Sequence, residues 1–237
     1  MPQVNQQNKR HPGGDILMGT DLRNRITGTG PEPEYRKADI PTAIRNFEKN
    51  RFSVKHFATK EEAADYLSET IRGKTVGFGD SATLAAMKIA EKLSEYNLVI
   101  DPASHPDDIF MLTAKDAMDT QVFLLSVNAA SETGELVNID SSGNRVGGSL
   151  FGHEKIYYVF SVNKIEPTLE RAIWRVRNIA APRNAKRFGF KTPCAIKGDR
   201  CYDCSSPDRI CNKLEICMKK GKVMEEEIVL IDEPLGY

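Results

Sequence analysis

Short apolar runs alternate with amphipathic stretches along most of the chain, and the two patterns predict different elements. Brief runs rich in β-branched and aromatic residues predict strands at 75–79, 98–100, 122–127, 156–160 and 228–231. Apolar positions three and four residues apart predict helices at 59–73, 82–93, 109–118 and 167–182. Strands and helices that alternate in this way are typical of an α/β protein with a doubly wound, mostly parallel sheet.

Individual residues mark where two of these helices begin or end. Thr59 followed by Glu62 is a capping box, which satisfies free backbone N–H groups at a helix start. Pro167 suits the first turn of the helix that carries Trp174. Pro182 is predicted to end that helix, because proline lacks the N–H group that a continuing helix needs.

The hydrophobic pattern begins only after about residue 35. Residues 1–35 contain Gln, Asn, Gly and Pro without a sustained period, so we expect a flexible N-terminal arm. Residues 36–237 then form one α/β domain, since 237 residues lie at the upper edge of what one domain usually holds. Within it, the short C-terminal segment 192–217 contains all five cysteines.

Composition narrows the classes of protein that fit. With 33 basic and 33 acidic residues the net charge is zero, which argues against nucleic acid as a partner. No apolar run approaches the roughly 20 residues that span a bilayer, and the polar N-terminus lacks the apolar core of a secretion signal. We therefore expect a cytoplasmic protein without a membrane span. In a reducing compartment, five cysteines favour a metal site or free thiols over disulfides.

The first candidate ligand site is the glycine-rich turn between the strand at 75–79 and the helix that follows it. Glycine allows the backbone to approach a ligand closely, and the N–H groups at a helix start attract negative charge. A small anion could therefore bind at Gly77, Gly79, Asp80, Ser81 and Thr83. A tight turn capped by Asp80 or Ser81 explains the same residues without a ligand, and the sequence leaves both interpretations open.

The second candidate site follows the strand at 122–127. Ligands of open α/β sheets lie beyond the carboxyl ends of the strands, where Asn128 is predicted to fall. The other residues that would line an anion site here are Asn138, Gly143, Asn144 and Arg145. Hairpin turns at 132–135 and 142–144 would explain the glycines equally well, but they explain Asn138 and Arg145 less readily.

Positively charged residues cluster on and after the helix that contains Trp174. They are Arg171, Arg175, Arg177, Arg183, Lys186 and Arg187. Our hypothesis is that the segment from Arg183 to Arg187, which includes Lys186, closes over an anionic ligand. The alternative is a solvated helix face whose charges complement the helix dipole near its C-terminus.

Four cysteines have the spacing of a metal site. Six, two and six residues separate Cys194, Cys201, Cys204 and Cys211, so the central pair can give two thiolates to one ion and the outer pair can complete four ligands. An iron–sulfur cluster or zinc would fit this set. A loop of reduced thiols is the alternative, and Cys217 lies outside the set.

Four stretches of the chain resemble the LUD-domain family, the lactate-utilisation proteins. They are residues 76–84, 127–145, 163–165 and 177–187. The tail at 192–194, 201–204 and 209–212 also fits the cysteine-bearing branch of that family. The resemblance extends from about residue 40 to the C-terminus.

The resemblance implies a fold similar to that of ribose-5-phosphate isomerase, glucosamine-6-phosphate deaminase and the coenzyme A transferases. Those relatives bind sugar phosphates or acyl-coenzyme A at the strand ends. It also implies a role in the oxidation of L-lactate to pyruvate, beside iron–sulfur proteins. This chain lacks ferredoxin-like cysteine runs, so its redox partner would be a separate protein. Asn128 stands where the related isomerases carry an acid, which argues against their proton transfer here.

Two hypotheses of function follow. In the first, the chain is a component of a redox system that oxidises L-lactate to pyruvate and binds a small carboxylate or phosphorylated anion. In the second, it is a ligand-binding or regulatory protein on a coenzyme A transferase/isomerase-like fold, with a structural metal. The residues leave open whether the chain is itself an enzyme, which would then be an oxidoreductase component. They also leave open whether it forms a homo-oligomer.

Overall fold

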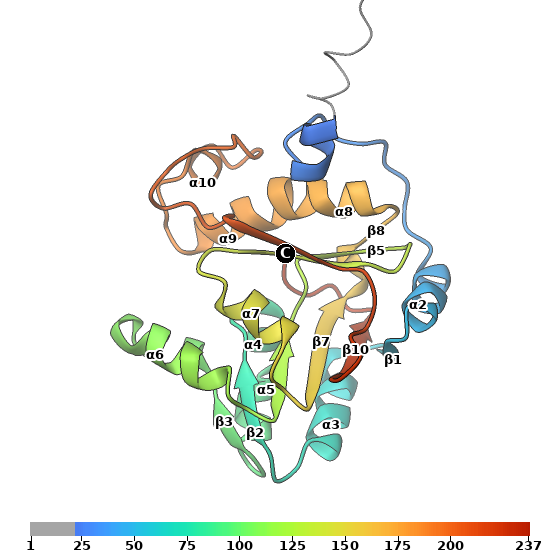
Figure 1. The fold of residues 1–237 in the computed structure, drawn as a ribbon, viewed down its shortest axis with the longest axis vertical. Coiled ribbons are helices and arrows are strands. Elements are labelled where there is room, and N and C mark those ends of the chain that lie inside the picture. The colour runs from blue at the N-terminus through green and yellow to red at the C-terminus, as the bar shows by residue number, and fades with distance from the viewer. Residues whose placement is uncertain (1–21) are drawn as a thin grey trace, which may run out of the picture.

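The computed structural model describes residues 22–237, and a six-stranded parallel sheet lies at its centre (Figure 1). The strand order is β1-β10-β7-β4-β2-β3, and every neighbouring pair is parallel. The strands are β1 (Ser53–Phe57), β2 (Thr75–Phe78), β3 (Leu98–Ile100), β4 (Val122–Leu125), β7 (Lys155–Ser161) and β10 (Glu225–Ile231). The predicted α/β fold with a doubly wound, mostly parallel sheet is therefore confirmed.

Helices cover both faces of this sheet, because successive side chains of a strand point to opposite faces. The helices are α2 (Ile40–Lys49), α3 (Lys60–Thr70), α4 (Ala82–Met87), α5 (Ile89–Leu93), the 3-10 helix η1 (Pro102–Ser104), α6 (Asp107–Ala117) and α7 (Asn144–Leu150). Val76, Leu124 and Val159 pack with α3, α4 and α5, whereas Phe123 and Tyr158 pack with α2 and α6. Each such buried side chain contributes about 1.5–3 kcal/mol, so two apolar layers stabilise the sheet.

A second sheet of four strands packs against helix α8 (Leu169–Arg175). Its order is β8-β5-β6-β9, with β5 (Ala129–Ser131), β6 (Leu136–Asp140), β8 (Ile165–Glu166) and β9 (Lys213–Cys217). Ala129, Val137 and Ile139 form one apolar cluster with Ala172 of the helix. The turn at 132–135 joins β5 to β6 as a hairpin, which was the alternative interpretation of its glycine.

Helix α8 continues directly into the π-helical turn η3 (Val176–Ala180) and helix α9 (Ala181–Arg187). The prediction that Pro182 ends this helix is therefore wrong. Pro182 lies in the first turn of α9, directly after the wider π turn, and a proline is tolerated in the first turn of a helix. The short helix α10 (Pro193–Lys197) follows in the cysteine-rich segment.

Most of the predicted N-terminal arm falls outside the described residues, which begin at residue 22. The part at 22–35 contacts α8 and η3. Asn178 donates a hydrogen bond to the carbonyl oxygen of Gly28 at 2.9 Å, and Arg171 pairs with Glu32 at 2.6 Å. In the part of the chain that the structure describes, no helix combines the length and apolar character needed to cross a membrane.

Gly77 lies inside β2, and the end of α6 packs closely against it. A Cβ atom at this position would lie 2.3 Å from the carbonyl oxygen of Ala117 and 2.6 Å from Thr120 Oγ1. We expect Gly77→Ala to lower the free energy of unfolding by about 1–3 kcal/mol, because the backbone of α6 would have to move. Urea denaturation followed by circular dichroism measures this change.

Gly147→Ala in α7 is the matched control for this substitution. Its new Cβ would meet only the flexible end of Met118, at 3.0 Å, and alanine favours a helix. We expect this variant to be at least as stable as the natural protein. Equal losses of stability in the two variants would contradict the packing role of Gly77.

Candidate functional site

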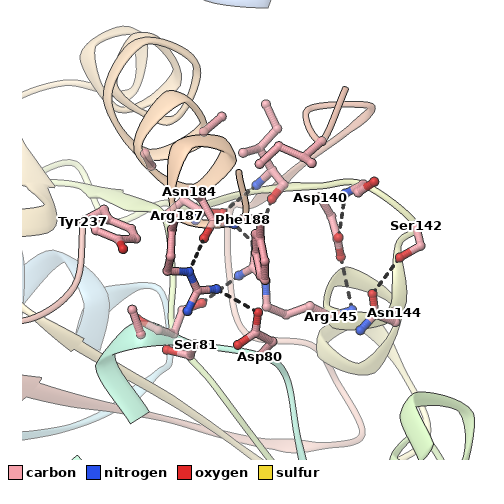
Figure 2. A pocket seen from close by; sticks show the side chains of 18 of the residues that line it. Asp80, Ser81, Asp140, Ser142, Asn144, Arg145, Asn184, Arg187, Phe188 and Tyr237 are labelled. Carbon is pink, nitrogen blue, oxygen red and sulfur yellow. Dashed lines mark hydrogen bonds and ion pairs between the residues drawn. The ribbon is translucent and has the colours of Figure 1, made fainter. Parts of the chain in front are cut away.

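A pocket of about 420 Å³ opens at the carboxyl ends of β2 and β4 (Figure 2). Strand β2 pairs with β3 on one side and with β4 on the other, so the order of strands reverses here. Such a switch point leaves a crevice in which doubly wound proteins bind their ligands. The walls come mainly from the turn after β2, the loop after β4, the start of α7 and one face of α9.

The turn after β2 contributes Asp80 and Ser81 to the pocket. The Ser81 hydroxyl also caps α4, since it accepts a hydrogen bond from the backbone N–H of Leu84 at 3.3 Å. Gly79 has no room for a side chain, because a Cβ there would lie 2.6 Å from Cγ of Arg145. The glycine turn therefore caps a helix and leaves space for the Arg145 side chain.

Arg145, near the start of α7, is a cation in the wall of the pocket. Its Nη1 donates hydrogen bonds to the carbonyl oxygen of Ser126 and to Asn138 Oδ1, both at 2.9 Å. Its Nη2 donates to Asn128 Oδ1 at 2.7 Å and to the carbonyl oxygen of Ile139 at 2.8 Å. All four acceptors are uncharged, so oriented dipoles hold this guanidinium in place.

Neighbouring residues fix Arg145 and its acceptors. Gly143 precedes α7 with a φ of 97°, which favours glycine, and the Asp140 carboxylate accepts a hydrogen bond from the backbone N–H of Arg145 at 3.1 Å. Asn138 Nδ2 donates to Glu215 at 3.0 Å, which leaves its Oδ1 for Arg145. Burial lowers the pKa of Arg145, and the charges of Asp140, Glu215 and Asp80 partly oppose this shift. None of these carboxylates forms an ion pair with the guanidinium within residues 22–237.

Lys164 reaches the pocket from the 3-10 helix η2 (Val162–Lys164), at the carboxyl end of β7. It is 4% exposed, and its Nζ donates to Thr83 Oγ1 and Ser126 Oγ at 3.0 Å and to a backbone carbonyl at 3.2 Å. Burial, together with the positive charges of Arg175 and Arg145, lowers the pKa of Lys164 to about 7. Near neutral pH a substantial fraction of this amine is therefore uncharged.

One face of α9 completes the pocket with Asn184 and Arg187. Arg187 pairs with Asp80 at 3.0 Å, and its Nε donates to Asn184 Oδ1 at 3.1 Å (Figure 2). Arg183 and Lys186 are exposed and do not line the pocket. Residues three apart share a face of a helix, so the pair 184/187 and the pair 183/186 point in different directions.

The three arginines of α8 and η3 are buried, so they do not form the solvated face that was the alternative interpretation. Arg171 pairs with the buried glutamate of β8 at 3.1 Å, and Arg175 donates to the carbonyl oxygen of Asn128 at 2.7 Å. Arg177 pairs with Asp203 at 2.8 Å. These contacts connect the long helix to the second sheet, to the pocket loop and to the cysteine-rich segment.

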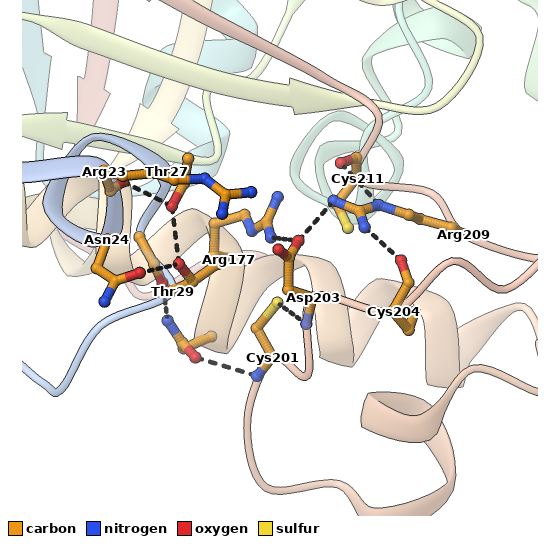
Figure 3. A network of polar contacts seen from close by, with 12 residues as sticks. Arg23, Asn24, Thr27, Thr29, Arg177, Cys201, Asp203, Cys204, Arg209 and Cys211 are labelled. Atoms are coloured by element: carbon orange, nitrogen blue, oxygen red, sulfur yellow. Dashed lines mark hydrogen bonds and ion pairs between the residues drawn. The ribbon is translucent and has the colours of Figure 1, made fainter. Parts of the chain in front are cut away.

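Three of the four predicted metal-binding cysteines lie close to Arg177 and Asp203 (Figure 3). Cys201 Sγ accepts a hydrogen bond from the backbone N–H of Asp203 at 3.3 Å. Burial raises the pKa of Cys211, the charges of Arg177 and Arg209 partly oppose this, and the neighbouring Cys201 and Cys204 add to the rise. We call Cys201, Cys204 and Cys211 the cysteine cluster.

The fourth cysteine, Cys194, lies in α10, and its thiol contacts the Thr192 hydroxyl at 3.3 Å. Among the described residues, no three Cys, His, Asp or Glu side chains are arranged to hold an ion. In this arrangement the four cysteines are not gathered as ligands of one ion. The metal centre stays a prediction.

The structure brings part of the predicted ligand set together. Five of the predicted residues line the pocket: Asp80, Ser81, Asn128, Asn144 and Arg145. Four more contact or precede lining residues and support them: Gly79, Thr83, Asn138 and Gly143. Three do not line the pocket: Gly77, Arg183 and Lys186.

Sequence reasoning missed Lys164, and it included Asn184 only as part of the segment 183–187, without a role of its own. Lys164 follows the strand predicted at 156–160 and therefore lies at the same edge of the sheet as Asn128, which is the signal that could have identified it. Asn184 lies three residues before Arg187, on the same helix face. The incorrect end of the helix at Pro182 concealed that signal.

The lowered pKa of Lys164 predicts how stability depends on pH. The unfolded chain keeps this proton up to the usual pKa of 10.5, whereas the folded chain loses it near 7, so the unfolded state binds more protons between these values. Rising pH should therefore stabilise the natural protein relative to Lys164→Met by up to about 1.4 kcal/mol per pH unit. Urea denaturation from pH 7 to pH 9 measures this difference, and parallel curves for the two proteins would contradict it.

The LUD domain family matches residues 40–231. No curated protein matches the chain. Among solved structures, the crystal structure of a DUF162 family protein from Deinococcus radiodurans is similar, with 12% sequence identity and a TM-score of 0.48 over 81% of this chain and 94% of that one. Because the family match spans most of the chain, the protein belongs to the LUD-domain family and, at the level of that family, is of the lactate-utilisation type.

Proposed function

We propose that the pocket binds a small carboxylate, L-lactate or pyruvate, and that the chain is a component of a redox system that oxidises L-lactate to pyruvate. The observation that carries this proposal is the environment of Arg145, whose four side-chain hydrogen bonds all go to uncharged oxygens. Arg145 is partly buried and forms no ion pair within residues 22–237, and a bound carboxylate would supply the opposite charge that a cation withdrawn from water usually has.

Two further cations support an anionic ligand. Lys164 can add a second positive charge, because a nearby anion favours the protonated amine. Arg187 is partly exposed, and its guanidinium has the planar geometry that binds carboxylates through two parallel hydrogen bonds. Asp80 and Asp140 also line the pocket, but Asp80 pairs with Arg187, and Asp140 accepts backbone hydrogen bonds at the start of α7.

Oxidation of L-lactate removes two electrons, which a separate redox protein would accept. The pocket of about 420 Å³ is larger than a three-carbon acid requires. Phe188 and Phe190 also line it, and both are partly exposed. This apolar part could receive the acceptor group of the partner, or the remainder of a larger phosphorylated anion.

A ligand-binding or regulatory protein with a structural metal is the second candidate function, and one observation favours it. Nε of Arg177 is buried and has no hydrogen-bond partner within residues 22–237, and the charge of Arg177 interacts with Cys201 and Cys211. Asp203 pairs with Nη2 of this guanidinium, and thiolates gathered on an ion would supply an acceptor for its Nε. The identity of the metal separates the two candidates.

Substitution of the cation at the edge of the pocket tests the proposed ligand. We expect Arg187→Ala to weaken the binding of L-lactate and pyruvate by about ten- to a hundredfold, because a charge-assisted hydrogen bond worth about 1.5–3 kcal/mol is lost. Isothermal titration calorimetry at low and high salt measures the two affinities.

Arg183→Ala is the matched control, because it removes the same charge from an exposed position of the same helix. Its affinity should stay within about twofold of the natural protein. An equal loss in both variants would show general charge attraction instead of a site in the pocket. Absence of lactate and pyruvate binding in the natural protein would refute the proposed function.

Anaerobic purification with elemental analysis and a visible spectrum tests the predicted metal. Iron with absorption that bleaches on reduction would support the redox component, whereas colourless protein with stoichiometric zinc would support the structural role. Cys201→Ser and Cys204→Ser should lose the metal, and Cys217→Ser should retain it because Cys217 lies in β9, outside the cluster. If neither metal is present at stoichiometric level, the metal prediction is wrong.

A further inference from the structure

The amine of Lys164 has an environment that simple anion binding does not require. Its three contacts are the hydroxyls of Thr83 and Ser126, each at 3.0 Å, and the carbonyl oxygen of Val127 at 3.2 Å. All three are uncharged, and no carboxylate pairs with this amine in the described part of the chain. Buried lysines are usually paired with an acid. Lys164 has no such partner among its contacts, so it does not serve as one half of an ion pair.

Each element packed around Lys164 presents either a positive charge or no charge to it. Arg145 of α7 and Arg175 of α8 are the positive groups. Thr83 of α4 presents a hydroxyl, and Gly236 packs directly on the amine, since a Cβ at Gly236 would lie 3.0 Å from Lys164 Nζ. The surroundings therefore favour the free amine over the ammonium ion.

A permanent positive charge is already present in this pocket. Arg145 keeps its charge at every pH at which the protein functions, so attraction of an anion to the pocket does not require Lys164 to be charged. Unlike a guanidinium, a free amine can act as a nucleophile, because its lone pair can attack a carbonyl carbon. Lysines that act in this way in other proteins are desolvated and lie near other cations, as Lys164 does.

We propose that Lys164 forms a covalent imine with the carbonyl carbon of a small 2-oxo acid bound in this pocket. The nitrogen lone pair attacks the carbonyl carbon to give a carbinolamine. Both hydrogens of the amine then leave with the former carbonyl oxygen as one molecule of water, and a carbon–nitrogen double bond remains. The hydroxyls of Ser126 and Thr83 are close enough to Nζ to relay these protons.

This inference rests on the proposed function for its ligand and names the chemical class of that ligand. A 2-oxo acid combines the carboxylate that Arg145 would attract with the carbonyl group that Lys164 would attack. L-Lactate carries the same carboxylate but a hydroxyl in place of the carbonyl, so it can bind in the pocket without reacting with the amine.

Borohydride reduction traps such an imine as a stable secondary amine. The natural protein is incubated with pyruvate near pH 7.5, reduced, and analysed by intact mass and by peptide mapping. We expect a gain equal to the mass of pyruvic acid less one oxygen atom, located at Lys164. L-Lactate under the same conditions should give no adduct.

Substitutions identify the reacting amine. Lys164→Met and Lys164→Arg should both lose the adduct, and Lys164→Arg keeps the positive charge. Lys115→Met is the matched control, because Lys115 is an exposed lysine of α6, and it should retain the adduct. Should both Lys164 variants fold poorly, the peptide map of the natural protein still decides the position of the adduct.

The possible results separate this inference from the proposed function. If calorimetry shows that pyruvate binds but no adduct forms at Lys164, the imine is refuted and the proposed function stands. Adducts spread over exposed lysines would also refute the imine. If neither pyruvate nor L-lactate binds, the proposed function and the imine both fail.

Discussion

The guanidinium of Arg145 connects the two sheets of the protein. Its acceptors belong to the loop after β4, through Ser126 and Asn128, and to β6, through Asn138 and Ile139. Removing such a charge from water costs several kcal/mol, and four oriented oxygens offset that cost in place of a carboxylate. The sheets are therefore held together by a cation whose field still attracts an anion into the pocket.

Backbone geometry and one buried acid make this arrangement possible. Gly79 leaves the space through which the side chain passes, and Gly143 provides the left-handed turn that begins α7. Burial raises the pKa of Glu215. The Glu215 carboxylate accepts a hydrogen bond from Asn138 Nδ2, which directs the amide oxygen of Asn138 toward Arg145. Each of these residues acts on the pocket through Arg145, although none of the three lines the pocket itself.

The continuous helix α8-η3-α9 links the pocket to the cysteine cluster. The π turn carries Arg177, which contacts the cysteine-rich segment, and α9 then presents Asn184 and Arg187 to the pocket. π-Helical turns occur frequently at functional sites, because the extra residue rotates the side chains that follow. One helical element thus positions residues of both candidate sites.

The sequence by itself determined the parallel sheet and one edge of it. Strands buried on both faces appear in the sequence as continuous apolar runs, which identified the sheet. The carboxyl ends of parallel strands share one edge of a sheet, so residues that follow two strands, such as Asp80 and Asn128, could be placed together. The second sheet was not predicted, because β5 and β8 have only three and two residues and leave no hydrophobic period. Tertiary structure alone decided which face of α9 lines the pocket, since residues 183/186 and 184/187 have the same spacing and only the packing of α8 and η3 sets the rotation. The charge state of Lys164 was decided in the same way, because the groups that desolvate and repel its proton come from segments far apart in the chain.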